Sequence, residues 1–302
     1  MKTLYNSPYY AALQAALDFR TAGQTAKANA MQHLADQPRA IWLGDWTKDV
    51  TKMVNDAVTA AGSTQIAVFV AYNIPQRDGT DYSAGGALDT VAYWKFIAQI
   101  AAGVKRRECW VVLEPDALAH VDFLIADGVT PEDALNQPAF AKRIAMLSAA
   151  VDTLTAAGAK VFIDAGSYNW VPASVMVPRL IAAGVARAAG FCVNPSDSET
   201  TANSVRFANE VREGIRYKTG VSVGFVVDVG RNGAGAPAGG GEAAWCNPSS
   251  LRIGAKPTLV TGIPNCRGLL WIKPPGESDG TCNGGPSAGT WWLEGALRLS
   301  GL

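Results

Sequence analysis

Short apolar runs alternate with amphipathic helical stretches along the whole chain, and this alternation limits the fold more than any other feature. Seven runs rich in β-branched and aromatic residues predict strands at 40–43, 66–72, 110–113, 161–163, 191–193, 223–227 and 269–272. Apolar residues at helical spacing predict helices at 53–61, 93–104, 144–157 and 202–217. Strands that are apolar on both faces and joined by helices predict a parallel sheet, either an α/β barrel or a doubly wound sheet.

The helix ends and the absence of a linker bear on domain organisation. The sequence Ala-Ala-Gly recurs at Gly62, Gly158 and Gly184, where glycine is expected to end a helix in the left-handed conformation. No composition shift or linker divides the chain. We therefore expect residues 1–302 to form a single catalytic domain.

Charge and composition exclude several classes of partner. The 26 Lys and Arg balance the 26 Asp and Glu, and no basic block offers phosphate contacts, so we expect no nucleic-acid partner. No apolar stretch approaches the roughly 20 residues that span a bilayer, so we expect no membrane partner. Because His33 and His120 are the only histidines, a histidine-rich metal site is disfavoured, and we expect neither metal nor cofactor.

Polar residues follow each predicted strand. In both candidate folds ligands bind at the carboxyl ends of parallel strands. The residues in this position are Asp45, Asn73, Arg77, Asp78, Glu114, Asp116, Asp164, Asn194, Asp228, Lys273, Glu277 and Asp279. Clustered carboxylates without histidine fit glycoside hydrolysis, Mg²⁺ or Ca²⁺ binding, or recognition of a neutral sugar.

Tryptophans in the same segments favour a sugar ligand. They are Trp42, Trp46, Trp170, Trp245, Trp271, Trp291 and Trp292. Indole faces stack on the apolar face of a pyranose, whereas a phosphate site would need basic residues and a Gly-rich turn. The Gly-rich segment 230–241 lacks the GxxxxGK[ST] pattern, so we interpret it as a loop on the substrate side.

Five motifs in order resemble glycoside hydrolase family 6, the inverting cellulases. They are Tyr72-Asn-Ile-Pro-Gln-Arg-Asp78, Leu113-Glu-Pro-Asp116, Phe162-Ile-Asp-Ala-Gly166, the segment from Ser222 to Asp228 with Arg231-Asn-Gly233, and Trp271-Ile-Lys-Pro-Pro-Gly-Glu-Ser-Asp-Gly280. The resemblance implies a single-domain, distorted parallel β/α barrel of about seven strands with an open active-site cleft. It also implies hydrolysis of internal β-1,4-glucosidic bonds with inversion.

The resemblance assigns four catalytic residues. Asp116 matches the general acid that protonates the leaving oxygen. Asp78 matches its neighbour, which would keep Asp116 protonated because two close carboxylates do not both ionise easily. Asp279 matches a base or electrostatic partner, acting directly or through a water chain. Tyr72 matches the tyrosine beneath the distorted reacting sugar.

Eight further residues match substrate-binding positions: Trp42, Ser83, Asp164, Trp170, Asn194, Trp245, Lys273 and Glu277. The tryptophans would stack on sugars on either side of the cleavage point. Lys273 and Glu277 would hydrogen-bond sugar hydroxyls, and Asp164 would act in binding or support the residues that do. Ser83 lies in the loop that closes over the site.

Four of the five cysteines fall into two groups, and the sequence leaves the state of the fifth, Cys266, open. Cys109 and Cys192 lie in strand-like runs and are expected to be buried apolar side chains. The resemblance implies a disulfide between Cys246 and Cys282, which suits a secreted protein. A second family disulfide is absent, since Gly79 stands at one of its positions, so a looser Asp78 loop is expected. The N-terminal residues lack the apolar stretch of a signal peptide, so a secreted protein would have a leader outside this sequence.

Alternatives remain at this stage. The short Asp78 loop and the few residues after Asp279 favour an open cleft and endo action on β-1,4-glucan, with a cellobiohydrolase of the same family as the alternative. A non-catalytic glycan-binding protein would not need the acids. A Mg²⁺-dependent barrel enzyme would use them as ligands and would lose activity in chelator. We expect a monomer.

Overall fold

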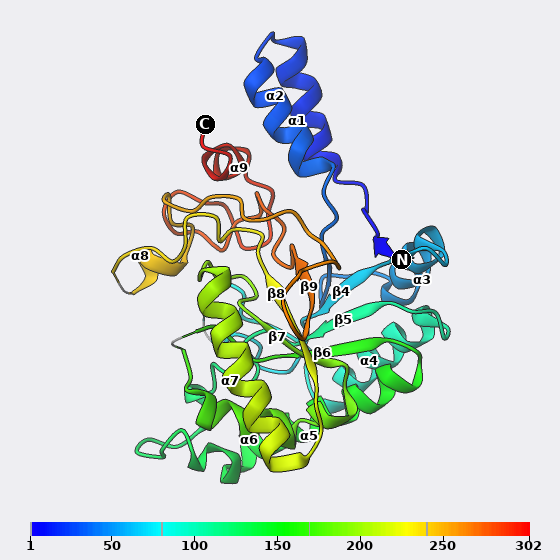
Figure 1. The fold of residues 1–302 in the computed structure, drawn as a ribbon, viewed down its shortest axis with the longest axis vertical. Coiled ribbons are helices and arrows are strands. Elements are labelled where there is room, and N and C mark those ends of the chain that lie inside the picture. The colour runs from blue at the N-terminus through cyan, green and yellow to red at the C-terminus, as the bar shows by residue number, and fades with distance from the viewer. Residues whose placement is uncertain (1, 80, 169, 240) are drawn as a thin grey trace.

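A seven-stranded, all-parallel sheet forms the centre of the protein (Figure 1). The computed structural model describes residues 2–79, 81–168, 170–239 and 241–302. The strands follow chain order and are β2 (Ile41–Leu43), β4 (Val68–Ala71), β5 (Trp110–Leu113), β6 (Lys160–Asp164), β7 (Gly190–Val193), β8 (Gly224–Asp228) and β9 (Cys266–Leu270). All seven predicted strands are confirmed, although β9 begins three residues earlier than predicted.

The two edge strands of the sheet meet, so the sheet closes into a distorted barrel. The amide of Ala40, before β2, donates to the carbonyl of Trp271, after β9, over 2.9 Å. The indole N–H of Trp42 donates to the carbonyl of Ile272 over 2.7 Å. Because these two bonds stand in place of a regular series of strand hydrogen bonds, the contact between β2 and β9 is weaker than the contacts between the other neighbouring strands. The barrel prediction is confirmed, and the doubly wound alternative is wrong.

Helices cover the outer face of the sheet. They are α3 (Val50–Ala61), α4 (Thr90–Val104), α5 (Pro138–Ala156), α6 (Ala173–Ala182) and α7 (Thr201–Thr219). The carboxylates of Asp49 and Asp89 cap α3 and α4 by accepting backbone N–H groups of their first turns. Gly62, Gly158 and Gly184 have positive φ values of 61°, 101° and 92°. Gly184 has the predicted left-handed conformation, whereas Gly62, with a ψ of −145°, lies outside it.

A helical hairpin near the N-terminus was not predicted. It consists of α1 (Tyr10–Thr21) and α2 (Thr25–Ala35) and projects from the barrel (Figure 1). Its contact face is largely alanine, for example Ala12 and Ala16 in α1. Small side chains allow close helix packing but produce little contrast between apolar and polar faces, so the helical period is weak in the sequence.

The core has two layers, one on each face of the sheet. The larger layer lies between the strands and the outer helices and includes Phe69, Val111 and Phe191. The smaller layer fills the barrel and includes Val70, Val112, Phe162 and Val226. Because side chains fill the barrel, a ligand can bind only at one of its ends.

The remaining described elements are short. β1 (Thr3–Leu4) pairs with β3 (Gln65–Ile66) in a two-stranded sheet, and α8 (Glu242–Trp245) and α9 (Leu293–Leu299) lie near the C-terminal strand ends. Three 3₁₀ helices span Asp122–Leu124, Asp133–Asn136 and Val185–Arg187. Within the described ranges, no helix combines the length and apolar character needed to cross a membrane.

Candidate active site

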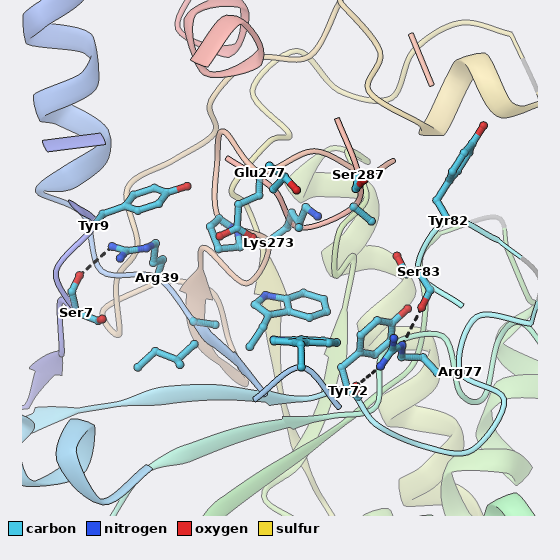
Figure 2. Close-up of a pocket in the computed structure, with 18 of the residues that line it drawn as sticks. Ser7, Tyr9, Arg39, Tyr72, Arg77, Tyr82, Ser83, Lys273, Glu277 and Ser287 are labelled. Carbon is cyan, nitrogen blue, oxygen red and sulfur yellow. Dashed lines mark hydrogen bonds between the residues drawn. The ribbon is translucent and has the colours of Figure 1, made fainter. Parts of the chain in front are cut away.

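Two adjoining cavities lie at the carboxyl ends of the strands. The acidic cavity has a volume of about 290 Å³ and is lined by five aspartates, Asp78, Asp81, Asp116, Asp197 and Asp279. The adjoining cavity has a volume of about 620 Å³ (Figure 2). Trp42, Tyr72, Ser83 and Lys273 line both cavities, so a ligand could extend from one into the other.

The fold brings most of the predicted site residues together. Nine line the acidic cavity: Trp42, Tyr72, Asp78, Ser83, Asp116, Trp170, Trp245, Lys273 and Asp279. Glu277 lines the adjoining cavity. Asp164 and Asn194 are fully buried. The Asn194 amide group donates to the Asp228 carbonyl over 2.9 Å and accepts from the Ser167 hydroxyl, so it holds strand ends together. The roles assigned to these residues stay predictions.

Asp116 is held in a left-handed backbone conformation. Its φ is 70°, and Glu114 two residues earlier has a φ of 50°. Such a conformation is unfavourable for side chains larger than glycine and persists only where neighbours enforce it. Here the amide of Asp116 donates to the Asp164 carboxylate over 2.8 Å, and Asp164 also accepts from the amide of Gly166 over 3.0 Å. Asp164 thereby fixes the direction of the Asp116 side chain.

Asp78 and Asp116 both retain protons more strongly than ordinary aspartates. Burial and then the charge of Asp116 raise the pKa of Asp78 to about 7. Burial also raises the pKa of Asp116; the charges of Asp197 and Asp81 raise it further, while His120 lowers it. The Tyr72 hydroxyl is a hydrogen-bond partner of Asp116. The cavity therefore contains a carboxyl group that can keep its proton near neutral pH.

The Asp78 loop is fixed by hydrogen bonds rather than by a disulfide. The amide of Ser83 donates to Asp78 over 3.1 Å, and the Arg77 guanidinium donates to the Ser83 carbonyl over 2.8 Å. Arg77 also pairs with Asp45 at 3.1 Å. Tyr82 of the same loop packs against Trp245 with ring centroids 6.1 Å apart. The loop is therefore tethered at several points, contrary to the expectation that the missing disulfide would leave it loose.

Two buried side chains hold the start of this loop. The Glu114 carboxyl accepts from the amides of Asn73 and Ile74 at 2.9 Å. The Arg143 guanidinium, from α5, donates to the carbonyls of Pro75 and Gln76, each over 2.9 Å. Burial raises the pKa of Glu114 to about 7 although these amide bonds lower it. Both side chains lie beneath the cavity and support the segment that leads to Asp78.

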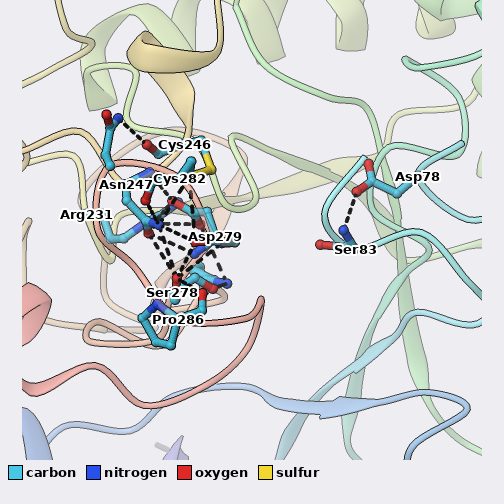
Figure 3. The surroundings of a disulfide bond; sticks show 12 residues. Asp78, Ser83, Arg231, Cys246, Asn247, Ser278, Asp279, Cys282 and Pro286 are labelled. Carbon is cyan, nitrogen blue, oxygen red and sulfur yellow. Dashed lines mark hydrogen bonds and ion pairs between the residues drawn. A yellow bond between two sulfur atoms is a disulfide. The ribbon is translucent and has the colours of Figure 1, made fainter. Parts of the chain in front are cut away.

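Asp279 has the opposite electrostatic environment. Its carboxylate pairs with Arg231 at 2.7 Å and with Lys273 at 3.6 Å, and it accepts from the amide of Asn247 over 3.0 Å (Figure 3). Burial alone would raise its pKa, but Arg231 and Lys273 hold that pKa below the usual value. Asp279 is therefore ionised where Asp116 is protonated.

The predicted disulfide between Cys246 and Cys282 is present and lies beside Asp279 (Figure 3). Asn247, next to Cys246, accepts from the Asp279 amide over 2.8 Å, so the disulfide and the Asp279 loop form one unit. Cys109 and Cys192 are buried as predicted, and Cys266 is buried as well. Gly240 of the Gly-rich segment lies outside the described residues, so its predicted loop role stays a prediction.

Aromatic rings line both cavities. Trp42 contacts Tyr72 edge-on at 5.1 Å between centroids, and Trp170 stacks on His120 at 4.8 Å. Trp245 lies against Tyr82, so the Asp78 loop touches the wall that carries the disulfide. The cleft predicted to be open is thus bridged at one point.

Several lining residues were not among the predicted site residues. Asp197 and Ser196 follow β7, directly after the Asn-Pro sequence identified at that strand end, so their position was a usable signal. Asp81 lies in the loop already identified at Asp78. His120 lies four residues after Asp116, and nothing in its local sequence marks it as a cavity residue.

Comparison with protein families identifies one match. The model of the family described as "Glycosyl hydrolases family 6" matches residues 1–300. "Endoglucanase A" of Cellulomonas fimi is 36% identical over 93% of this chain and 58% of its own length. "Endoglucanase 1" of Streptomyces halstedii is 37% identical over 92% of this chain and 82% of its own length. This chain therefore spans little more than half of the Cellulomonas relative.

A solved structure shares the whole fold. The endoglucanase Cel6 of Mycobacterium tuberculosis, in complex with methyl-cellobiosyl-4-deoxy-4-thio-β-D-cellobioside, superposes with a TM-score of 0.86 and 33% sequence identity. The match covers 100% of this chain and 97% of that one. That protein binds a cello-oligosaccharide analogue.

Proposed function

Because this chain belongs to glycosyl hydrolases family 6, we propose that it hydrolyses internal β-1,4-glucosidic bonds of cellulose and related glucans with inversion. One observation carries the proposal. Asp116 has a raised pKa, whereas Asp279 in the same cavity has a lowered one. A protonated and an ionised carboxyl flanking one bond are what acid-assisted glycoside hydrolysis requires.

The proposed reaction places the reacting sugar ring over Tyr72, where the two cavities meet. Asp116 donates its proton to the oxygen of the leaving sugar, which departs into the acidic cavity. A water molecule attacks the anomeric carbon from the opposite face, and direct attack inverts the configuration. The water's proton leaves through solvent or through Asp279.

Asp279 acts chiefly by charge in this scheme. Its ion pairs with Arg231 and Lys273 make it a weak base, but they keep it ionised where positive charge develops on the sugar. The charge of Asp116 raises the pKa of the nearby Asp78, so the two carboxyl groups do not easily lose both protons.

The proposed sugar-binding roles follow from the residues that line the two cavities. Trp42, Trp170 and Trp245 present aromatic surface along the two cavities, and Lys273 and Glu277 provide polar groups between them. Ser83 holds the Asp78 loop through its hydrogen bond to Asp78. Asp164 and Asn194 are buried and support the site by hydrogen bonds to Asp116 and Asp228. The names of the Cellulomonas and Streptomyces relatives described above support endo action, since both are endoglucanases.

One observation favours the alternative, a cellobiohydrolase. The contact of Tyr82 with Trp245 bridges the cleft, and a bridged cleft hinders entry of a chain from the side. We further propose that residues 1–302 form a single catalytic domain and that the protein is secreted and monomeric. The disulfide supports secretion, because such bonds persist in oxidising compartments.

The test uses carboxymethylcellulose with and without EDTA. We expect release of reducing ends in both conditions, and none from an Asp116→Asn variant. Loss of activity in EDTA would indicate a metal-dependent enzyme, and binding without release would indicate a glycan-binding protein. Endo action predicts that viscosity falls steeply for each bond cut, whereas a cellobiohydrolase releases reducing ends with little change in viscosity.

A further inference from the structure

The adjoining cavity continues well past the residues that the reaction needs. It extends from Tyr72, whose ring Trp42 contacts, to Arg39 and Tyr9 (Figure 2). Arg39 lies three residues before Trp42, which along extended chain is about 10 Å. Because Asp116 lies in the other cavity, the leaving sugars occupy that side. The adjoining cavity therefore faces the sugars on the non-reducing side of the cleaved bond.

The far end of this cavity is a fixed polar structure. The Arg39 guanidinium lies 3.8 Å from the centroid of the Tyr9 ring. It donates to the carbonyls of Ser7 and Pro8, each over 2.9 Å. Tyr9 is buried and contacts Trp291 edge-on at 5.1 Å. Two of the five guanidinium N–H donors are used in this way, so Arg39 can remain in place and still donate to a ligand.

Glu277 provides the complementary acceptor. Its side chain lines the same cavity and is partly buried. The positive charges of Lys273, Arg39 and Arg231 lower the pKa of Glu277, against the larger effect of burial, which raises it. Among the described residues, no group donates a hydrogen bond to its carboxyl group. The carboxyl oxygens of Glu277 can therefore accept hydrogen bonds from a ligand in this cavity.

We propose that Arg39, Tyr9 and Glu277 form an additional binding site for a neutral glucosyl unit, the third on the non-reducing side of the cleaved bond. The inference rests on the proposed function and extends it. Guanidinium donors and a carboxylate acceptor match the neighbouring hydroxyls of a glucopyranose, each of which both donates and accepts. An acid beside the guanidinium at this end of the cavity suits a neutral ligand with several hydroxyls better than an anion.

The test follows which bond of cellopentaose is cleaved, with the reducing end labelled with ¹⁸O. Cleavage to cellotriose and labelled cellobiose places three units on the non-reducing side, whereas cleavage to cellobiose and labelled cellotriose places two. We expect the first pattern to dominate in the wild type. Arg39→Gln should lower the ratio of first to second pattern at least fivefold, and Glu277→Gln should lower it as well.

Controls separate binding from damage to the fold. Arg20, an exposed arginine in α1 away from the cavity, provides the matched variant Arg20→Gln, which should keep the wild-type ratio. Arg39→Gln should also slow cellopentaose more than cellotetraose, whereas a misfolded protein would lose both equally. An unchanged ratio in Arg39→Gln, with hydrolysis retained, would overturn the additional site alone. No hydrolysis of any cello-oligosaccharide by the wild type would overturn the proposed function, and this inference with it.

Discussion

The amide of Asp116 donates to the carboxyl group of Asp164 over 2.8 Å, so a residue of β6 orients the proposed acid that follows β5. The two carboxyls also interact through charge: burial raises the pKa of Asp164 well above its usual value, and Asp116 is the next contributor. Asp164 thus fixes the position of Asp116, and the charge of Asp116 in turn helps Asp164 to keep its own proton.

Asp197→Asn should shift the pH profile of kcat, because the charge of Asp197 raises the pKa of Asp116. Asp116 must be protonated to act, so its deprotonation sets the alkaline limb. Without the Asp197 charge, the pKa of Asp116 falls and the alkaline limb moves to lower pH. kcat should fall more than KM rises. Asp127→Asn, at an exposed acid, is the control and should leave the profile in place. If the alkaline limb lies at the same pH in the tested variant as in Asp127→Asn, the removed charge does not act on the pKa of Asp116.

Asp116→Ala should reduce hydrolysis of cellohexaose by about 10²–10⁴-fold, the usual contribution of a general acid. A dinitrophenyl cellobioside should lose much less, because its leaving group needs no proton. The measurement is kcat/KM for the two substrates in the variant and the wild type. Equal losses on both would remove Asp116 from the role of acid.

Hydrolysis should release the α-anomer first. Direct attack of water on a β-linkage inverts the anomeric carbon, and no carboxylate becomes attached to the sugar. Proton NMR of cellohexaose hydrolysis in the first minutes, before mutarotation, measures the anomer ratio. Early β-anomer would show a retaining double displacement and would contradict the roles of both Asp116 and Asp279.

The protein should be more stable at pH 5 than at pH 7.5, partly through Glu114. Its pKa is about 7 when folded and about 4.3 when unfolded, so between these values the folded state holds a proton that the unfolded state lacks. The free energy of unfolding therefore falls as pH rises through this range. Glu114→Gln cannot titrate and should show a smaller fall in urea unfolding. This variant should still lose some stability as the pH rises, because Asp78 and Glu277 also have pKa values of about 7.

Reduction of the Cys246–Cys282 disulfide should destabilise the protein by roughly 3–4 kcal/mol in the chain-entropy model, since the bond links residues 36 apart. It should also lower kcat, because Asn247 beside it bonds to Asp279. Thermal unfolding and activity with and without dithiothreitol measure both effects. The Cys246→Ser/Cys282→Ser variant should not respond to dithiothreitol. A response there would point to the buried thiols instead.

The sequence by itself determined the elements and the edge of the sheet that carries the site. Alternation of β-branched runs with helices is a local property, so the strands at residues 110–113 and 224–228 were found nearly to the residue. Glycine at 62, 158 and 184 marked helix ends for an equally local reason. The acids that follow parallel strands were bound to gather, because all these strands end on the same side.

Only the tertiary structure decided what each strand-end acid does. Glu114, Asp164 and Asp228 turn beneath the cavity and accept backbone amides of neighbouring strand ends. Asp116 and Asp279 face into it, and one retains its proton while the other is ionised. These acids look alike in sequence, since each follows or ends a strand. Their roles depend on burial and on partners such as Arg231, which the chain brings together from distant segments and which no local pattern encodes.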